Sequence, residues 1–276
     1  NLHIVSAAAG AIRNLETCIS RCHLVIADRV VSPYASALAC LVDDEKQLGV
    51  TLIGGHTEIT YGIDRPLAVG AMLGEVDKDR VVLTSGAKPG DAIVITKGIA
   101  VEGTAILARE AADTLTAHGV SADVIDRAAE FLFSPGISVV RDASIAVDAA
   151  PVHAMHDPTE GGLVGGLLEM AMGAGVGMEI DRTSIPVLPE TQAVCDALGL
   201  DPLGLIASGS LLAAVAPDDV QALTTALGDA GIGAFDIGRV TDKSQGLRMG
   251  TASGNVDLPR FERDELARFF GRDETS

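Results

Sequence analysis

One turn of the sequence, residues 156–162, combines residue types that could bind a phosphate and its metal ion. It reads His-Asp-Pro-Thr-Glu-Gly-Gly and precedes an apolar stretch that predicts a helix. Asp157 offers a carboxylate for Mg²⁺ that bridges to phosphate oxygens. Thr159 can cap the helix, and Gly161 and Gly162 let a ligand approach the first helical N–H groups, which have no partner within the helix. The same residues are equally compatible with a tight, capped turn that binds nothing.

A second glycine turn lies earlier in the chain. Gly54, Gly55, His56 and Thr57 follow the short apolar run 50–53, which predicts a buried strand. Two glycines after a strand expose backbone N–H groups, and the side chains of His56 and Thr57 can reach an oxyanion. Taken alone, such a turn is more often structural than functional.

Other polar residues have ordinary structural explanations. Lys97 and Glu102 lie at the end of a predicted strand and the start of a predicted helix, where a surface ion pair of little energetic value is the usual arrangement. The turn at 208–210 is compatible with a simple entry into a strand. Three residues have no identifiable partner and are interpreted as structural: His118, His153 and Cys195.

Composition predicts a large aliphatic core. The chain has 276 residues, of which 47% are hydrophobic, 3% are aromatic and none is Trp. This length suits two modest domains. No apolar stretch is long enough for a membrane span and the first residues do not resemble a signal peptide, so we expect a cytoplasmic protein. The four cysteines match neither a disulfide framework nor a zinc site.

The charge of the chain restricts its partners. The net charge is −18, without any run of basic residues, which argues against binding to nucleic acid. An acidic surface that aids solubility is the simplest interpretation. An acidic protein that binds a nucleotide needs local positive potential from metal ions or helix N-termini.

The elements around the 156–162 turn alternate between strands and helices. Turn-forming residues at 84–91 mark a domain boundary, which predicts domains at 1–84 and 85–255 and a terminal helix and tail at 256–276. We expect strands at 50–53, 67–73, 92–96, 177–181, 210–215 and 234–240. We expect one helix that ends at Gly49, further helices at 102–115, 122–133, 161–174 and 189–198, and one that begins at Pro217. This alternation predicts an α/β or α+β fold.

Several phrases of the sequence resemble a known family. H-D-P-T-E-G-G-L, G-V-G-M-E-I-D, D-P-L-G-L-I-A-S-G-S-L-L and the final D-I-G-R-V look like the C-terminal domain of the AIR-synthetase (PurM)-like superfamily. Its members include aminoimidazole ribonucleotide synthetase, selenophosphate synthetase, thiamine-monophosphate kinase and the hydrogenase expression/formation protein HypE. The resemblance covers roughly residues 41–240 and is nearest to the HypE-like, AIR-synthase-related branch.

The resemblance implies a two-domain homodimer that holds ATP and Mg²⁺ between its domains and phosphorylates or activates a small substrate. Asp157 matches a metal-ligating and catalytic aspartate, and His56 is the second catalytic candidate. The remaining matches are cofactor-binding positions: Gly54, Gly55, Thr57, Thr159, Gly161 and Gly162. Lys97 and Glu102 also resemble a cleft-facing position of the family, and the turn 208–210 resembles a family turn that faces the cleft.

The first 37 residues depart from the family, whose N-terminal aspartates have no counterpart there. The chain also lacks the terminal cysteine of HypE-type proteins. Three readings therefore stand: an ATP-dependent HypE-like enzyme, a non-catalytic member that serves as a nucleotide-binding or partner-binding scaffold, and a kinase of the thiamine-phosphate type.

Overall fold

The computed structural model describes residues 76, 78 and 80–271. Contacts divide the chain into two units, Asn1–Glu75 and Val76–Ser276, and all described residues belong to the second. The elements predicted up to residue 73 lie outside the described residues. The boundary predicted after residue 84 stays a prediction, although the short 3₁₀ helix η1 (Thr84–Gly86) already packs on the second unit.

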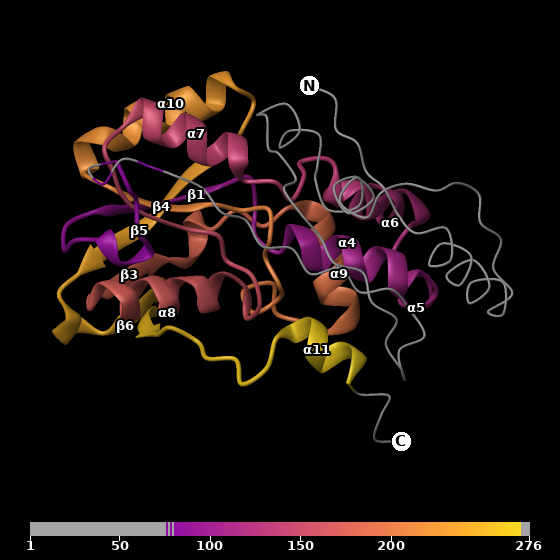
Figure 1. The fold of residues 1–276 in the computed structure, drawn as a ribbon. Coiled ribbons are helices and arrows are strands. Elements are labelled where there is room, and N and C mark those ends of the chain that lie inside the picture. The colour runs from indigo at the N-terminus through magenta and orange to yellow at the C-terminus, as the bar shows by residue number, and fades with distance from the viewer. Residues whose placement is uncertain (1–75, 77, 79, 272–276) are drawn as a thin grey trace, which may run out of the picture. The chain divides into compact units, whose positions relative to one another are not determined.

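The described part of the chain contains seven strands in one mixed sheet, in the order β2-β4-β1-β5-β3-β6-β7 (Figure 1). All neighbouring strands are antiparallel except β3 and β6, which are parallel. The strands are β1 (Ala92–Thr96), β2 (Val152–His156), β3 (Gly177–Asp181), β4 (Leu212–Val215), β5 (Ala234–Thr241), β6 (Leu247–Thr251) and β7 (Gly254–Asp257). The mixed α/β fold that the alternating pattern predicts is confirmed.

Helices pack on the sheet and beside it. They are α4 (Val101–Glu110), α5 (Ala112–Ala117), α6 (Ala122–Ala129), α7 (Val140–Ala149), α8 (Gly162–Ala174), α9 (Pro189–Leu198), α10 (Val220–Asp229) and α11 (Glu265–Phe270). None of the helices in this part is long and apolar enough to cross a membrane.

The sheet is buried on both faces because its central strands carry apolar side chains at consecutive positions. Along β1, Ile93 and Ile95 join the core beneath α8, whereas Ala92 and Val94 join the core beneath α7 and α10. Figure 1 shows α8 on one side of the sheet and the pair α7 and α10 on the other. The alternation of side chains along one strand thus holds three layers together.

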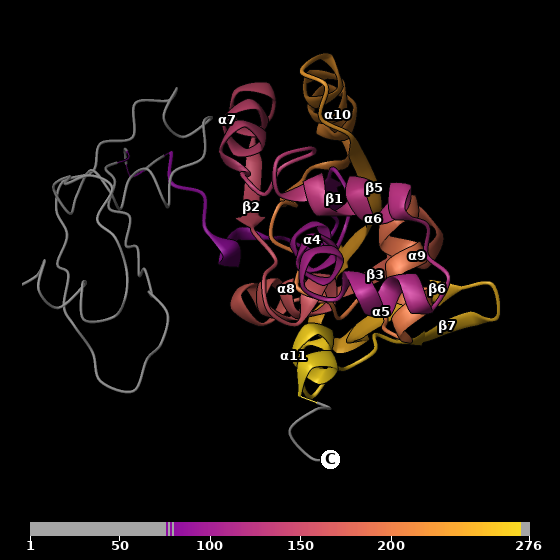
Figure 2. The same ribbon diagram turned by 90° about the vertical axis from the view of Figure 1, so that its right-hand side faces the viewer.

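A second group of helices forms its own core. Helices α4, α5, α6 and α9 contact one another and gather beside the sheet (Figure 2). Leu107, Leu115, Val194 and Cys195 are buried between them. Burial in this apolar core raises the pKa of the Cys195 thiol to about 12. Cys195 is therefore a packing residue, as predicted, and its thiol stays protonated at neutral pH.

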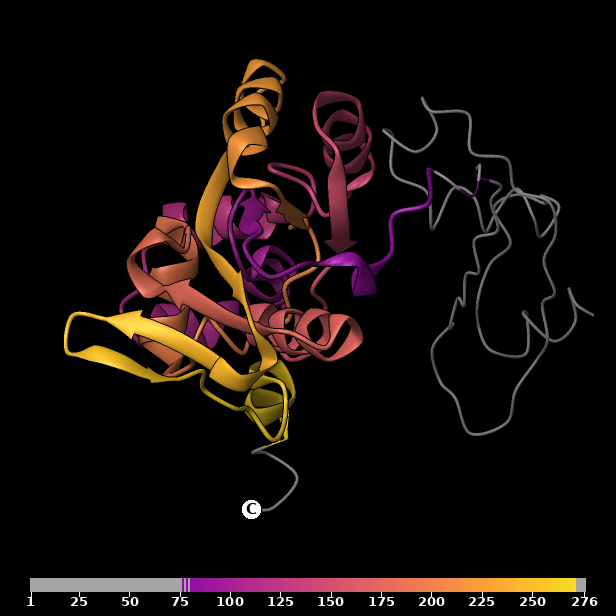
Figure 3. The same cartoon turned by 90° about the vertical axis from the view of Figure 1, so that its left-hand side faces the viewer.

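The structure corrects several predicted elements. The helix predicted at 102–115 is two helices that meet at Ala111, and the one predicted at 122–133 ends at Ala129 and continues as the 3₁₀ helix η2 (Glu130–Leu132). The helix at Pro217 opens as 3₁₀ helix η4 (Pro217–Asp219) before α10. The sheet does not end at residue 240, since the hairpin of β6 and β7 extends it (Figure 3). Helix α7 and strand β2 were also missed.

A buried ion pair fastens β1 to α7. Lys97 Nζ lies 3.2 Å from Asp142 Oδ2, and both side chains are buried. Asp142 also accepts a hydrogen bond of 2.6 Å from the hydroxyl of Thr96, while Lys97 donates one of 2.5 Å to the carbonyl of Ser138. The surface ion pair expected between Lys97 and Glu102 is therefore wrong, because Lys97 turns inward to a partner 45 residues away.

The loop 203–208 lies between the starts of α4 and α8. Gly103 N donates to the Ile206 carbonyl over 3.2 Å, and Val164 N donates to the Leu203 carbonyl over 3.2 Å. A Cβ at Gly162 would lie 2.6 Å from the Leu203 carbonyl oxygen, and one at Gly103 would lie 2.5 Å from the Leu205 side chain. Both helix starts therefore approach the loop at distances that only glycine permits.

Replacing Gly162 by Ala should destabilise the protein by about 2–4 kcal/mol, because the new Cβ would overpack against the loop and strain the left-handed backbone, whose φ is 66°. The free energy of unfolding in urea measures this. Gly228→Ala is the matched control, since a Cβ there, inside α10, meets nothing within 4 Å and should stabilise by about 0.5–1 kcal/mol. Equal effects of the two substitutions would contradict the close-approach argument.

Asp142→Ala should cost about 3–5 kcal/mol, because it leaves the ammonium group of Lys97 buried without its carboxylate. The control is Asp123→Ala, which breaks an exposed ion pair with Arg127 and should change stability by less than about 1 kcal/mol. Denaturant unfolding of both variants gives the comparison. A small loss for Asp142→Ala would mean that the carbonyl partners of Lys97 suffice.

Candidate functional site

The 156–162 turn connects β2 to α8, as the sequence predicts. The helix begins at Gly162, and Gly161 occupies the N-cap position with a φ of 79°. The N-cap residue is a glycine and makes no side-chain capping bond, so the predicted cap by Thr159 is wrong. The Thr159 carbonyl instead accepts hydrogen bonds from Gly162 N at 3.0 Å and Ala207 N at 3.2 Å. Backbone geometry, supplied by two left-handed glycines, starts the helix.

A carboxylate of the protein lies at the start of α8. Asp264 Oδ2 accepts a hydrogen bond of 2.7 Å from Gly161 N, and its Oδ1 caps α11 through Leu266 N at 2.7 Å. This carboxylate lies at a helix N-terminus, where negative charge is stabilised, and it occupies the position predicted for a phosphate. Phosphate binding by Gly161 and Gly162 stays a prediction, and at Gly161 N a phosphate would compete with Asp264.

Asp157, the predicted metal ligand, is exposed in the turn. Glu160 lies three residues after Asp157. The pKa of its carboxyl is lowered by hydrogen bonds from the Glu160 N–H and from the Thr159 hydroxyl. Among the residues that the structure describes, no group of three or more His, Cys, Asp or Glu side chains is placed to hold a metal ion. Mg²⁺ is often held by one or two carboxylates together with substrate phosphates and water, and Asp157 fits that use.

The neighbouring histidines, His153 and His156, have structural partners in the fold. His156 Nε2 lies 2.8 Å from Glu169 Oε2, and its Nδ1 lies 3.3 Å from the Thr84 hydroxyl. His153 Nδ1 lies 2.9 Å from Asp91 Oδ1, a pairing across 62 positions that sequence reasoning missed. These contacts fix β2 to α8 and to the start of β1.

The loop 203–208 brings further polar groups towards the turn. Ala207 N donates to Thr159, and the next residue, Ser208, accepts a hydrogen bond of 3.3 Å from Glu102 N at the start of α4. The buried hydroxyl of Ser210 donates a hydrogen bond of 2.5 Å to the Gly98 carbonyl, so its burial has a structural explanation. The contact of Glu102 with this loop could not be predicted from local pattern, because Ser208 lies 106 positions away in the sequence.

The other predicted cofactor-binding residues cannot be placed. Gly54, Gly55, His56 and Thr57 lie outside the described residues. Their catalytic and nucleotide-binding roles therefore stay predictions.

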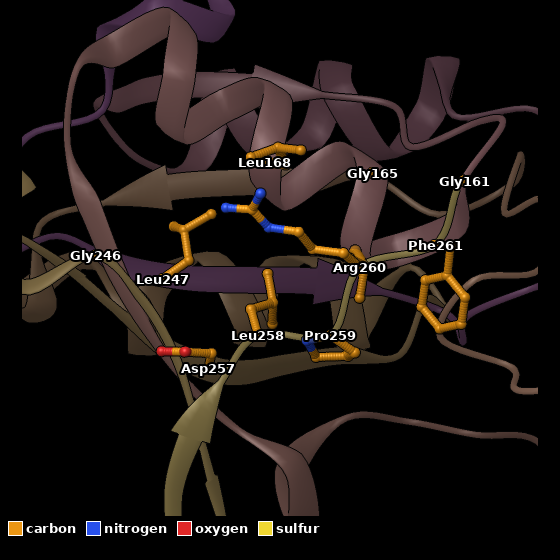
Figure 4. Close-up of a pocket in the computed structure, with 11 residues that line it drawn as sticks. Gly161, Gly165, Leu168, Gly246, Leu247, Asp257, Leu258, Pro259, Arg260 and Phe261 are labelled. Carbon is orange, nitrogen blue, oxygen red and sulfur yellow. The ribbon is translucent and has the colours of Figure 1, made fainter. Parts of the chain in front are cut away.

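A pocket of about 690 Å³ lies along α8 on the side of the C-terminal segment (Figure 4). Its walls are mainly apolar, and Figure 4 shows the guanidinium of Arg260 extending between Leu168 and Leu247. Gly161 and Gly165 of the turn and of α8 also line it. Residues 257–261 line the pocket and lie just before Asp264, which bonds the start of α8.

Solved structures of HypE are among those similar to this chain. HypE of E. coli, described as a hydrogenase maturation protein, aligns with a TM-score of 0.56 at 25% identity, over 68% of this chain and 55% of that one. A HypE structure in complex with ATP aligns with a TM-score of 0.51 at 26% identity, over 70% of this chain and 57% of that one.

Curated relatives cover two activities. Carbamoyl dehydratase HypE of Cupriavidus necator is 34% identical over 190 residues, which are 66% of this chain and 49% of the relative. A selenide, water dikinase of Geobacter sp. is 31% identical over 236 residues, which are 75% of this chain and 63% of the relative. The chain thus spans about half to two thirds of these relatives' length.

The family assignment rests on the described unit. Residues 88–249 match the family AIR synthase related protein, C-terminal domain. This match runs from the segment before β1 to β6 and includes the 156–162 turn, α8 and the loop 203–208. The chain belongs to the AIR synthase related family, within the PurM-like superfamily.

Proposed function

We propose that this protein is an ATP-dependent enzyme of the HypE-like branch, which transfers a phosphoryl group to a small substrate or uses ATP to activate it. The observation that carries the proposal is the convergence of two helix starts, α4 and α8, on the loop 203–208, which also bonds the 156–162 turn at Thr159. Helix N-termini supply positive potential where an acidic protein of net charge −18 otherwise offers little. The similarity to a HypE structure with ATP supports the nucleotide.

In this proposal Asp157 would hold Mg²⁺, which would supply positive charge at the phosphates. Gly161, Gly162 and Thr159 lie at the phosphates, and Gly54, Gly55, His56 and Thr57 complete the nucleotide site. We further propose a cytoplasmic homodimer with a role in hydrogenase maturation. A protein that acts chiefly by positioning ATP and metal has little covalent chemistry of its own to supply, so the placement of these groups decides the rate.

A scaffold that binds a nucleotide or partner without turnover is the second candidate. The contact of 2.7 Å between Asp264 Oδ2 and Gly161 N favours it, because the protein's own carboxylate already fills part of the helix start. The two candidates differ in whether Mg²⁺ and ATP together bind and react.

Mg²⁺ with ATP should raise the melting temperature of the full chain. Ligand at about 100 times its dissociation constant adds about 2.7 kcal/mol, which corresponds to roughly 5 °C or more for a protein of this size. Differential scanning fluorimetry with ATP, with and without Mg²⁺, makes the measurement. A cooperative melt that ATP and Mg²⁺ leave unchanged would rule out the nucleotide site in this chain.

Asp157→Ala should abolish the Mg²⁺-dependent part of that shift and leave the ligand-free melting temperature within about 2 °C, because the side chain is exposed. Asp148→Ala, at an exposed aspartate of α7, is the control and should retain the full shift. Retention of the Mg²⁺ effect in Asp157→Ala would remove this residue from the metal site.

A further inference from the structure

One carboxylate in the described unit has a buried oxygen without a partner. Glu102 Oε2 and Thr241 Oγ1 are the two buried side-chain polar atoms there that make no hydrogen bond. An unmet buried carboxylate oxygen is destabilising, so most such oxygens in folded proteins are bonded. Glu102 lies in the first turn of α4, where the helix dipole offsets part of that penalty. This oxygen is therefore a hydrogen-bond acceptor that the described residues leave unused.

Glu102 is tied to the candidate nucleotide turn through adjacent residues of one loop. Its N–H donates to Ser208 O at 3.3 Å, and the preceding residue, Ala207, donates to Thr159 O at 3.2 Å. Because Ser208 and Ala207 are consecutive, the first turn of α4 and the 156–162 turn are held in a fixed relation by one loop. The backbone at Glu102 and the turn that carries Asp157 are therefore bonded to consecutive residues of the same loop.

The backbone before Glu102 is strained. Lys97 and Ala100 have φ values of 60° and 56°, a left-handed conformation that residues with a Cβ rarely adopt. The strain is maintained by the bonds of Lys97 to Asp142 and Ser138 and by a hydrogen bond of 2.7 Å from Lys97 N to Gly233 O. Strain held by so many contacts is typical of functional sites. Here it sets the position at which α4 begins, and with it that of Glu102.

We propose that Glu102 is the general base of the phosphoryl transfer, an inference that rests on the proposed function. The carboxylate accepts the proton from the O–H or N–H group of the phosphoryl acceptor. As that oxygen or nitrogen bonds to the γ-phosphorus of ATP, the bond from phosphorus to the β–γ bridging oxygen breaks and ADP leaves with its electron pair. The acceptor is thus a small molecule with a hydroxyl or amide group, and water takes its place when no substrate is present.

The test measures ATP hydrolysis by the full chain with Mg²⁺, with water as the acceptor. Glu102→Gln should lower kcat by about 10²–10⁴-fold, the usual contribution of a general base, and change the dissociation constant of ATP less than twofold. Added acetate should partly restore turnover to Glu102→Ala, because it supplies a carboxylate. Glu110→Gln is the control, since Glu110 is exposed at the other end of α4, and it should keep the wild-type kcat.

A stability measurement checks the free carboxylate independently of nucleotide. Glu102→Met keeps the side-chain length and removes the unpartnered oxygen, so it should raise the melting temperature by about 2–4 °C. A lower melting temperature would overturn the proposal, as would wild-type kcat in Glu102→Gln or ATP binding without hydrolysis in the wild type. Absence of ATP binding in the wild type would instead refute the proposed function itself, whatever the behaviour of Glu102.

Discussion

Two helices of this protein begin against the carbonyl groups of one short loop, and the candidate site depends on that contact. Gly103 and Val164 donate backbone hydrogen bonds to the loop 203–208, and Gly162 lets the loop approach closer than a Cβ would allow. The loop therefore satisfies N–H groups that helix starts leave without intrahelical partners. It also fixes the first turn of α4 relative to the turn that carries Asp157.

The electrostatic potential near this loop is more positive than the net charge of the molecule suggests. The chain has a net charge of −18, yet two helix N-termini point to the same loop. The carboxylate of Asp264 offsets part of that positive potential by accepting a hydrogen bond from Gly161 N. The protein thus stabilises an anionic group at α8 even without a ligand. The enzyme and the scaffold differ in whether ATP reacts at this position.

Much of the described fold could be predicted from local pattern. Strand 177–181 and helix 189–198 were predicted with the observed bounds, because Pro189 suits the first turn of a helix and Gly199 adopts the left-handed conformation that ends one. Strand β2 was missed because its two histidines interrupt the apolar pattern, and their partners, Asp91 and Glu169, are distant in sequence. The β6–β7 hairpin was missed for a related reason, since all of β7 is exposed and carries no core pattern.

The sequence by itself determined the mixed α/β fold, the family and the turn with Asp157, because periodicity, capping residues and short motifs are local properties. Only the tertiary structure decided the pairings: Lys97 with Asp142, Gly161 with Asp264, and Glu102 with the loop at Ser208. Each joins residues that are 45 to 106 positions apart in the numbering. Such contacts follow from the packing of sheet and helices, so no local pattern of residue types announces them.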